Sequence, residues 1–533
     1  MRFVILSALA LVAASAPTID PARIKADVRT LSSDRFAGRG PGEEGEAMTV
    51  AFLTRTMREI GLEPAGDAGG WTQDVPLVRL DRQPGATMTL GGRTLLPGRD
   101  VSLAFRNEGA TALRDAPVVF AGWGTVDPTL GWDVYEGVDL RGKVVLLLAN
   151  DPDLEGGRDL GFGGRALSFA GRTGTKVAAA VKAGAAGVIV VHEEAALSWP
   201  FSQAASGDAL PAFSYAPLQP SALQFSAILK REIADSLLAA AGKTLTGLKL
   251  QARDRRFRAV PLGGLRVSVA GANRATSVTS HNVLGKITGT DRANEFVLYG
   301  AHWDANGLNG PDTTGDGIRN GAIDNATGTA ELLEIARAFK AGKRPRRTVV
   351  FAGWTSEEKG LLGSDWFAAH PTISLARTAA VINLDPHVAL PAARNLELIG
   401  PGQTDLEAEL RTVAGQAGLR VDPEPSPEAG WYFRSDHYPF AQRGVPALAF
   451  RAGRDLVTGG TARGAAIVAR YNQNCYHQPC DEFDRAWTSA GTAQEARAAH
   501  AVGARLADSD RWPRWLAGAP YGAVRATTAG ERR

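Results

Sequence analysis

The strongest constraint on the fold is a series of short, almost entirely apolar runs in the second half of the chain. The runs 296–301, 348–352 and 378–384 have the length of buried strands, and residues 330–340 repeat apolar side chains at helical spacing. Buried strands that alternate with helices are typical of a mostly parallel sheet with right-handed crossovers. The sequence therefore predicts an α/β fold for this half.

Acidic and histidine side chains follow each of these runs. His302 and Asp304 follow the first, Glu357 and Glu358 follow the second, and Asp385 follows the third. Ligands of open α/β sheets bind beyond the carboxyl ends of the strands. We therefore expect these side chains to gather around one site at that edge of the sheet.

Two further candidate ligands lie outside the strand ends. Asp324 precedes the predicted helix, and His477 lies in a loop between Cys475 and Cys480. Together with His302, Glu358 and Asp385 they give two imidazoles and three carboxylates, a set that suits zinc. A bridging carboxylate from Asp324 would divide the five into two sets of three, which leaves each ion an open position for a shared water.

Composition sets further limits. The 533 residues predict about two to four domains. Lys and Arg number 59 against 56 Asp and Glu, and this near-balance gives no electrostatic footprint for nucleic acid. Only two cysteines are present, which excludes a cysteine-rich zinc module.

The N-terminus has the pattern of an export signal. Arg2 precedes the apolar run 3–14, and Ala14-Ser15-Ala16 fits a small-x-small cleavage site. We predict a signal peptide over residues 1–16 and a secreted or periplasmic protein. Cleavage after Ala14 and a buried N-terminal element remain alternatives. No later run approaches roughly 18 unbroken apolar residues, so no membrane span is expected.

A separate unit is predicted between residues 110 and 265. The runs 117–122, 144–148 and 187–191 have the composition of buried strands, and residues 176–182 form an alanine-rich helical segment. We predict a smaller, β-rich domain here. It would be inserted into a main domain made of residues 17–109 and 266–533.

Six pieces of the sequence resemble the dizinc exopeptidases of peptidase family 28, which include bacterial leucyl aminopeptidases and glutamate carboxypeptidase-like enzymes. In chain order they are HWD 302–304, NGAIDNATG 320–328, EEKGLLGS 357–364, NLD 383–385, SDHYPF 435–440 and YH 476–477. Residues 110–265 resemble a protease-associated (PA) domain through GKVVLL 142–147 and AGAAGVIVV 183–191. The resemblance implies a zinc-exopeptidase core of the phosphorylase/hydrolase-like type with a PA insertion.

The resemblance also implies the roles of the site residues. One zinc would be held by His302, Asp324 and Asp385, and the other by Asp324, Glu358 and His477. Catalytic roles are implied for three more residues: Glu357 as general base, Asp304 as the carboxylate that orients His302, and Tyr476 as an oxyanion hydrogen-bond donor. A cis peptide bond is expected between Asp324 and Asn325.

Several features differ from the family pattern or stay open. Ala305 stands where many relatives have a histidine, and residues 385–388 lack the usual glycine-bearing continuation. His437 fits a structural role and a substrate-pocket role equally well. The other histidines are expected at the surface or in packing: His192, His281, His370, His387 and His500. Residues 312–317 imitate half of a calcium loop, but Ile323 occupies the position of the required acidic residue.

The cysteines allow two interpretations. Cys475 and Cys480 flank His477, so zinc binding through sulfur is conceivable. In an exported protein with only two cysteines, a disulfide between them is favoured.

The sequence thus predicts an exported zinc aminopeptidase that hydrolyses N-terminal residues from peptides with a water activated by two zinc ions. The alternatives are a glutamate-carboxypeptidase-like dizinc hydrolase, a glutaminyl cyclase-like enzyme with one zinc, and a non-catalytic receptor-like protein. Peptides are the expected partners, and nucleic acid is not.

Overall fold

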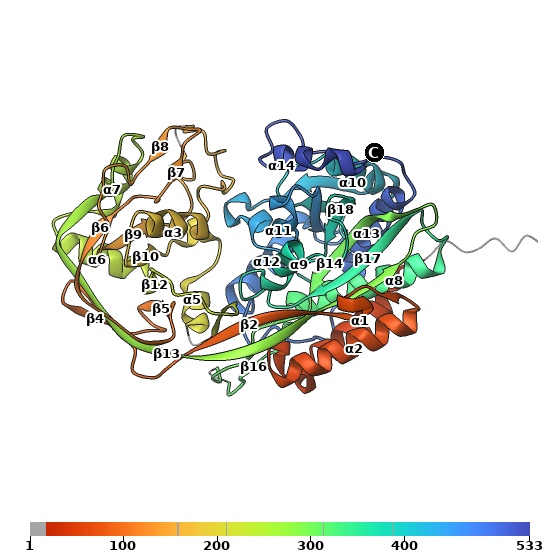
Figure 1. Cartoon of the computed structure of the whole chain (residues 1–533), viewed down its shortest axis with the longest axis horizontal. Coiled ribbons are helices and arrows are strands. Elements are labelled where there is room, and N and C mark those ends of the chain that lie inside the picture. The colour runs from red at the N-terminus through yellow and green to blue at the C-terminus, as the bar shows by residue number, and fades with distance from the viewer. Residues whose placement is uncertain (1–17, 157–158, 209, 313, 387, 533) are drawn as a thin grey trace, which may run out of the picture.

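The computed structural model describes residues 18–156, 159–208, 210–312, 314–386 and 388–532. The predicted signal peptide, residues 1–16, lies outside this part of the chain. Two lobes lie side by side, and two long strands, β2 and β13, run from one into the other (Figure 1).

The larger lobe is built on a mixed sheet whose four central strands are parallel. The strand order follows from the pairings. It is β2 (Thr72–Arg82), β13 (Val260–Ile287), β17 (Arg347–Trp354), β14 (Arg292–His302), β18 (Thr378–Asn383), β21 (Ala447–Ala452), β19 (Asn395–Leu398) and β20 (Arg420–Pro423). β17, β14, β18 and β21 form the parallel centre. The α/β prediction is confirmed.

Helices cover both faces of this sheet. In β14, Val297 and Tyr299 join one apolar cluster while Leu298 joins another, because successive side chains point to opposite faces. Five helices pack on the first face: α1 (Pro21–Leu31), α2 (Glu44–Ile60), α8 (Gly328–Ala341), α10 (Leu406–Gln416) and α13 (Ala490–Ala507). α9 (Leu362–Ala369) and α11 (His437–Gln442) pack on the second. With both faces buried, the strands read as continuous apolar runs.

The smaller lobe has its own core around four parallel strands. Their order is β6 (Gly109–Phe120), β9 (Val144–Leu148), β10 (Gly187–Val191) and β12 (Phe225–Leu229). The helices α3 (Thr173–Lys182), α6 (Arg231–Ala240) and α7 (Leu245–Ala252) accompany them. One apolar cluster lies on each side of these strands.

The smaller lobe takes up more of the chain than the predicted segment 110–265. β3 (Thr87–Leu90), β4 (Arg93–Leu95) and β5 (Val101–Phe105) lie before residue 110 and share its core. Their short, half-polar sequences gave no sign of this, because each strand buries only alternate residues. The chain leaves the larger lobe after Arg82 and returns at Asn273, and these two residues are paired across β2 and β13.

None of the helices within the described ranges has both the length and the apolar character needed to cross a membrane.

The pairing of Arg82 with Asn273 predicts that the larger lobe folds alone. Replacing residues 83–272 by Asn-Gly would close β2 and β13 with a two-residue hairpin turn. We expect a cooperatively unfolding, monodisperse protein, checked by circular dichroism and size-exclusion chromatography. Deleting only 110–265 should instead give an aggregating protein, since the buried side chains of Met88 and Phe105 would lose their partners. If the two deletions behave alike, the boundary argued above is wrong.

Candidate metal centre

The five predicted ligands converge at the carboxyl edge of the parallel strands. Asp324 lies in the segment that leads into α8, and its two oxygens face different histidines. Oδ1 is 3.2 Å from Nε2 of His302, and Oδ2 is 3.2 Å from Nε2 of His477. Asp385 Oδ1 lies 3.9 Å from His302 Nε2, and Glu358 Oε2 lies 3.1 Å from His477 Nε2. The ligand atoms therefore form two groups of three that share Asp324.

These groups fit zinc. Ligands about 2.0–2.1 Å from a tetrahedral ion lie about 3.3 Å from one another, close to the separations observed here. Two of the buried atoms, His302 Nε2 and Glu358 Oε1, have no hydrogen-bond partner among the described residues. A buried polar atom without a partner is costly, so a cation between these groups would satisfy both.

The electrostatics of the groups favour a cation. Burial would lower the pKa of His302, yet the negative charge of Glu357 and the surrounding carboxylates raise it well above its usual value. Burial likewise would raise the pKa of Asp324, but its contacts with the imidazoles of His302 and His477 hold it below its ordinary range. In the absence of metal the imidazoles attract protons, so metal ions and protons compete for the same atoms.

Asp304 organises the loop that carries the glutamates. Its Oδ1 accepts a hydrogen bond from the backbone N–H of Glu357 at 3.0 Å, and its Oδ2 one from Glu358 at 3.4 Å. The contact with His302 differs from the predicted one, because β14 ends at His302 and Asp304 does not continue the strand. The atom hydrogen-bonded to His302 Nδ1 is the Asp304 backbone carbonyl, at 3.1 Å, with carboxylate Oδ1 at 3.6 Å.

The neighbouring glutamates Glu357 and Glu358 lie in different surroundings. Glu358 joins the group around His477, whereas Glu357 belongs to neither group and lines a cavity beside Asp324 and Asp385. Burial, with the negative charges of Asp436 and Glu358, raises the pKa of Glu357 well above its usual value, against the opposing charge of His302. A carboxylate of raised pKa is a stronger proton acceptor.

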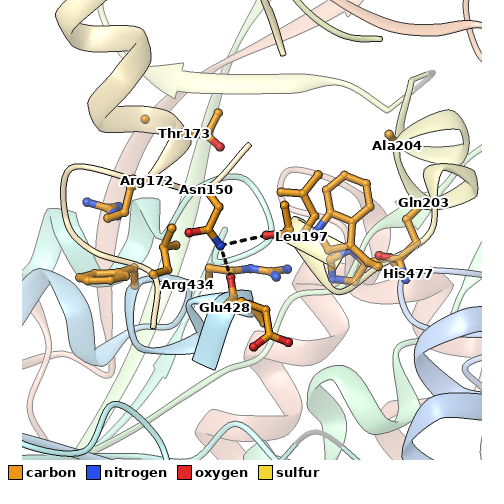
Figure 2. A pocket seen from close by; sticks show the side chains of 16 residues that line it. Asn150, Arg172, Thr173, Leu197, Gln203, Ala204, Glu428, Arg434 and His477 are labelled. Atoms are coloured by element: carbon orange, nitrogen blue, oxygen red, sulfur yellow. Dashed lines mark hydrogen bonds between the residues drawn. The ribbon is translucent and has the colours of Figure 1, made fainter. Parts of the chain in front are cut away.

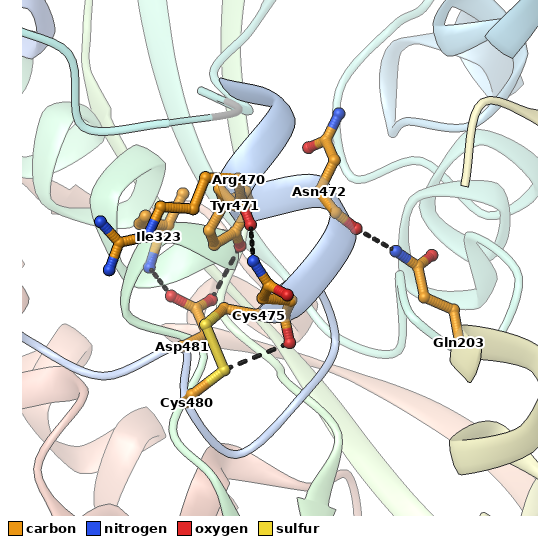
Figure 3. Close-up of a disulfide and its surroundings, with 9 residues drawn as sticks. Gln203, Ile323, Arg470, Tyr471, Asn472, Cys475, Cys480 and Asp481 are labelled. Atoms are coloured by element: carbon orange, nitrogen blue, oxygen red, sulfur yellow. Dashed lines mark hydrogen bonds between the residues drawn. A yellow bond between two sulfur atoms is a disulfide. The ribbon is translucent and has the colours of Figure 1, made fainter. Parts of the chain in front are cut away.

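The loop around His477 is closed by a disulfide between Cys475 and Cys480, as predicted (Figure 3). His477 itself adopts a left-handed backbone conformation, φ +61°, which is uncommon for a residue with a side chain. The ring of Tyr476 stacks on its imidazole with centroids 3.8 Å apart. Tyr476 is buried, and its hydroxyl accepts a hydrogen bond from Arg434 Nη2 at 3.2 Å.

Asp481, which no sequence pattern singles out, positions the shared ligand. Its carboxylate accepts hydrogen bonds from the backbone N–H groups of Ile323 and Asp324, at 2.9 and 3.1 Å, and from the Tyr471 hydroxyl at 3.0 Å (Figure 3). It thereby ties the Asp324 segment to the disulfide loop. The peptide bond after Asp324 is cis, as expected.

A second residue that no sequence pattern singles out is Arg39, which is fully buried. Its guanidinium donates to the backbone carbonyls of Leu31, Trp303, Asn320 and Gly321. The last three carbonyls belong to the loops beside His302 and Asp324. The glycine-rich break at residues 36–42 was visible in the sequence, but no local pattern tells a buried arginine from an exposed one.

The remaining polar residues of the site support the ligands. Ser435 donates to Asp385 Oδ2 at 2.6 Å and accepts from Asn383 at 2.7 Å. His437 is fully buried against Tyr432 and also lines the cavity beside Asp385, so both proposed environments apply to it. The other described histidines make local contacts away from the two groups: His192, His281, His370 and His500. His387 lies outside the described residues.

A cleft between the lobes leads to this site. It has a volume of about 390 Å³ and is lined from the smaller lobe by Asn150 and Trp199, and from the larger lobe by Arg434 and His477. Asn150 donates to the backbone carbonyls of Ala196 and Glu428 and so links the lobes at the cleft wall (Figure 2).

The chain is similar to known peptidases in part of its sequence. Residues 282–501 match the model of peptidase family M28. The chain is 35% identical over 166 residues to aminopeptidase NAALADL1 of Mus musculus, covering 30% of this chain and 21% of the relative. It is 28% identical over 219 residues to leupeptin-inactivating enzyme 1 of Streptomyces exfoliatus, covering 39% of this chain and 44% of the relative. The matches therefore cover between about a fifth and somewhat less than half of the length of these relatives.

Solved structures show the same fold over nearly the whole chain. An aminopeptidase from Aneurinibacillus sp. strain AM-1 superposes with a TM-score of 0.55 at 18% identity, over 91% of this chain and 93% of that one. BSAP, a zinc aminopeptidase from Bacillus subtilis, superposes with a TM-score of 0.51 at 19% identity, over 93% of this chain and 97% of that one. The similarity extends over both lobes.

The position of Asp481 predicts that it controls metal affinity. Asp481→Asn keeps the shape but replaces one oxygen by an NH₂ group, which cannot accept a backbone hydrogen bond. Zinc affinity should fall by about 10- to 100-fold, measured by titration against a competing chelator. Asp484→Asn is the matched control, since this carboxylate caps only the N–H of Ala486. Unchanged zinc affinity in Asp481→Asn would show that the Asp324 segment does not need this anchor.

Proposed function

We propose that this protein is an exported zinc aminopeptidase that removes N-terminal residues from peptides and binds two zinc ions around Asp324. The observation that carries the proposal is the carboxylate of Asp324, which presents one oxygen to His302 and the other to His477. Glu357, which belongs to neither ligand group, borders the same cavity. A carboxylate shared by two ligand groups, beside one that belongs to neither, suits a two-metal hydrolase with a separate proton acceptor.

One ion would be held by His302, Asp324 and Asp385, and the other by Asp324, Glu358 and His477. When bound, the ions would supply positive charge that acidifies a water molecule and polarises the scissile carbonyl. Asp304 would keep both glutamates and the His302 ring in place.

The remaining steps belong to Glu357 and Tyr476. Glu357 would accept the proton of the attacking water and return it to the leaving amine. The Tyr476 hydroxyl would donate to the carbonyl oxygen as negative charge develops there. Burial raises the pKa of Tyr476 well above its usual value, and the charge of Arg434, whose N–H donates to the Tyr476 oxygen, opposes that rise.

The smaller lobe, residues 83–272, would be a PA domain that forms one wall of the cleft. Its residues Asn150 and Trp199 line the space through which the rest of a peptide would leave the site. Export, inferred from residues 1–16, agrees with the disulfide, since disulfides persist in oxidising compartments.

The alternatives are less well supported. A glutaminyl cyclase-like site needs one zinc, whereas two ligand groups are present. A receptor-like protein would not need five intact ligands and a free Glu357. A carboxypeptidase is the strongest rival, because one relative, from Arthroderma benhamiae, is named a probable glutamate carboxypeptidase. The aminopeptidases with the same fold over more than 90% of the chain favour action on N-termini.

A paired assay tests the function. The zinc-loaded protein should cleave aminoacyl-nitroanilides, which have a free N-terminus, and leave N-acetylated dipeptides with a free C-terminus intact. A chelator should abolish turnover, and added zinc should restore it. Cleavage of the acetylated dipeptides alone would make the protein a carboxypeptidase.

The separate environments of Glu357 and Glu358 predict different consequences of the same substitution. Glu357→Gln should keep two zinc ions per chain while turnover falls by about 10²- to 10⁴-fold, the usual contribution of a general base. Glu358→Gln should bind fewer than two ions, because an anionic ligand is lost. Metal analysis and nitroanilide turnover measure both effects. Zinc loss in Glu357→Gln with zinc retained in Glu358→Gln would exchange the two roles.

A further inference from the structure

A second, smaller cavity lies next to the ligand groups and inside the larger lobe. Its lining includes the acidic residues Asp324, Asp385 and Glu357 and also Trp431, Arg434 and Arg451. Every residue that lines it comes from the larger lobe, whereas the cleft is lined by both lobes. Arg434 lines both spaces, so the small cavity lies next to the cleft.

The cavity and the cleft would hold different parts of a peptide substrate. In an exopeptidase the terminal residue occupies the closed end of the site, and the rest of the peptide leaves through the open end. The small cavity is the closed end, and the cleft between the lobes is the open one. The cavity beside Asp385 would therefore receive the side chain of the first residue.

The guanidinium of Arg451 has a nitrogen that is not used in hydrogen bonding. Arg451 is only 5% exposed, its Nε donates to Glu397 Oε2 at 3.2 Å, and its Nη2 has no partner among the described residues. A buried N–H group without an acceptor is unfavourable. A substrate oxygen in the cavity would correct this deficit.

Two guanidinium groups, those of Arg434 and Arg451, line the same cavity as the ligand carboxylates. Glu397 is shared between two guanidiniums, because Arg454 Nε also lies 3.3 Å from its Oε1. Arg434 forms no ion pair with any carboxylate in the described part of the chain. Both Arg434 and Arg451 lie over the ring of Trp431, with Cζ 4.5 and 5.7 Å from its centroid, which holds the two cations at the same wall.

Space in the cavity favours a short group. Its volume accessible to water-sized molecules is about 40 Å³. One buried water needs about 10–15 Å³ on this measure, so the cavity has room for a few non-hydrogen atoms. That is enough for a carboxymethyl group, whose oxygens could accept a hydrogen bond from Arg451. A branched aliphatic side chain has no acceptor for Arg451.

We propose that Arg451 is a specificity-determining residue that selects peptides with an N-terminal aspartate or glutamate. The inference rests on the proposed aminopeptidase function and goes beyond it by naming the substrate class. Arg451 would bind the side-chain carboxylate with its unpartnered N–H, and Arg434 would add positive charge at the entrance. A charge-assisted bond of this kind is geometrically selective for an anion with two oxygens.

Wild-type protein tests the proposal in two ways. Turnover of aspartyl-, glutamyl- and leucyl-nitroanilide should give a kcat/KM at least about tenfold higher for the acidic residues. Calorimetric binding of free aspartate, glutamate and leucine to the zinc-loaded protein should rank in the same order. All three amino acids carry the same α-carboxylate, so the difference reports the side chain alone.

Two matched variants assign the effect to one residue. Arg451→Met keeps the length and removes the charge, so the acidic-to-leucine ratio should fall about tenfold or more in both measurements. Arg454→Met removes the other partner of Glu397 without lining this cavity, so the ratio should stay unchanged. Thermal unfolding and zinc content show whether each variant is folded and loaded.

Each outcome of these experiments supports or overturns the proposal. Leucine binding as tightly as aspartate and glutamate to the wild type would overturn the proposal, even if Arg451→Met fails to fold. An equal loss of preference in Arg454→Met would assign the selectivity to general charge instead of Arg451. If no nitroanilide is cleaved, the aminopeptidase function fails, while the binding order of the amino acids still supports or overturns the acidic pocket.

Discussion

The site depends on one carboxylate that two distant parts of the chain must share. Asp324 can face His302 and His477 only if the end of β14, the segment before α8 and the loop after α12 (Gly460–Asn474) meet within a few ångströms. Each oxygen then belongs to a separate ligand group. Placing several acidic groups and two imidazoles side by side is unfavourable unless cations join them. The surrounding structure therefore has to hold the ligands against their own repulsion.

Buried hydrogen bonds to the backbone provide this support. Asp481, Asp304 and Arg39 each engage two or more main-chain groups of the ligand-bearing loops. Main-chain contacts fix the path of a loop whatever its side chains are. The loops at the strand ends can then carry ligands without regular secondary structure of their own.

Sequence patterns predicted the elements and the ligands but not their supports. The strand at 348–352 and the helix at 330–340 were predictable because their side chains follow simple periods. His302, Asp324 and Glu358 were predictable because their residue types and order match a family pattern. Asp481 and Arg39 were not, since their function lies in contacts 157 to 282 residues away along the chain. The strands β3 to β5 were placed outside the smaller unit for a similar reason, because β5 pairs with β12, β3 with β13, and β4 with β3.

The long strand β13 has a mechanical consequence. It is hydrogen-bonded to β2 over eleven consecutive residue pairs and continues into the sheets of both lobes. A paired ribbon resists stretching and sliding, because either would break its ladder, but it twists and bends easily across its plane. Bending of this ribbon would change the width of the cleft, and contacts between the lobes would oppose it, such as that of Asn150 with the backbone carbonyl of Glu428.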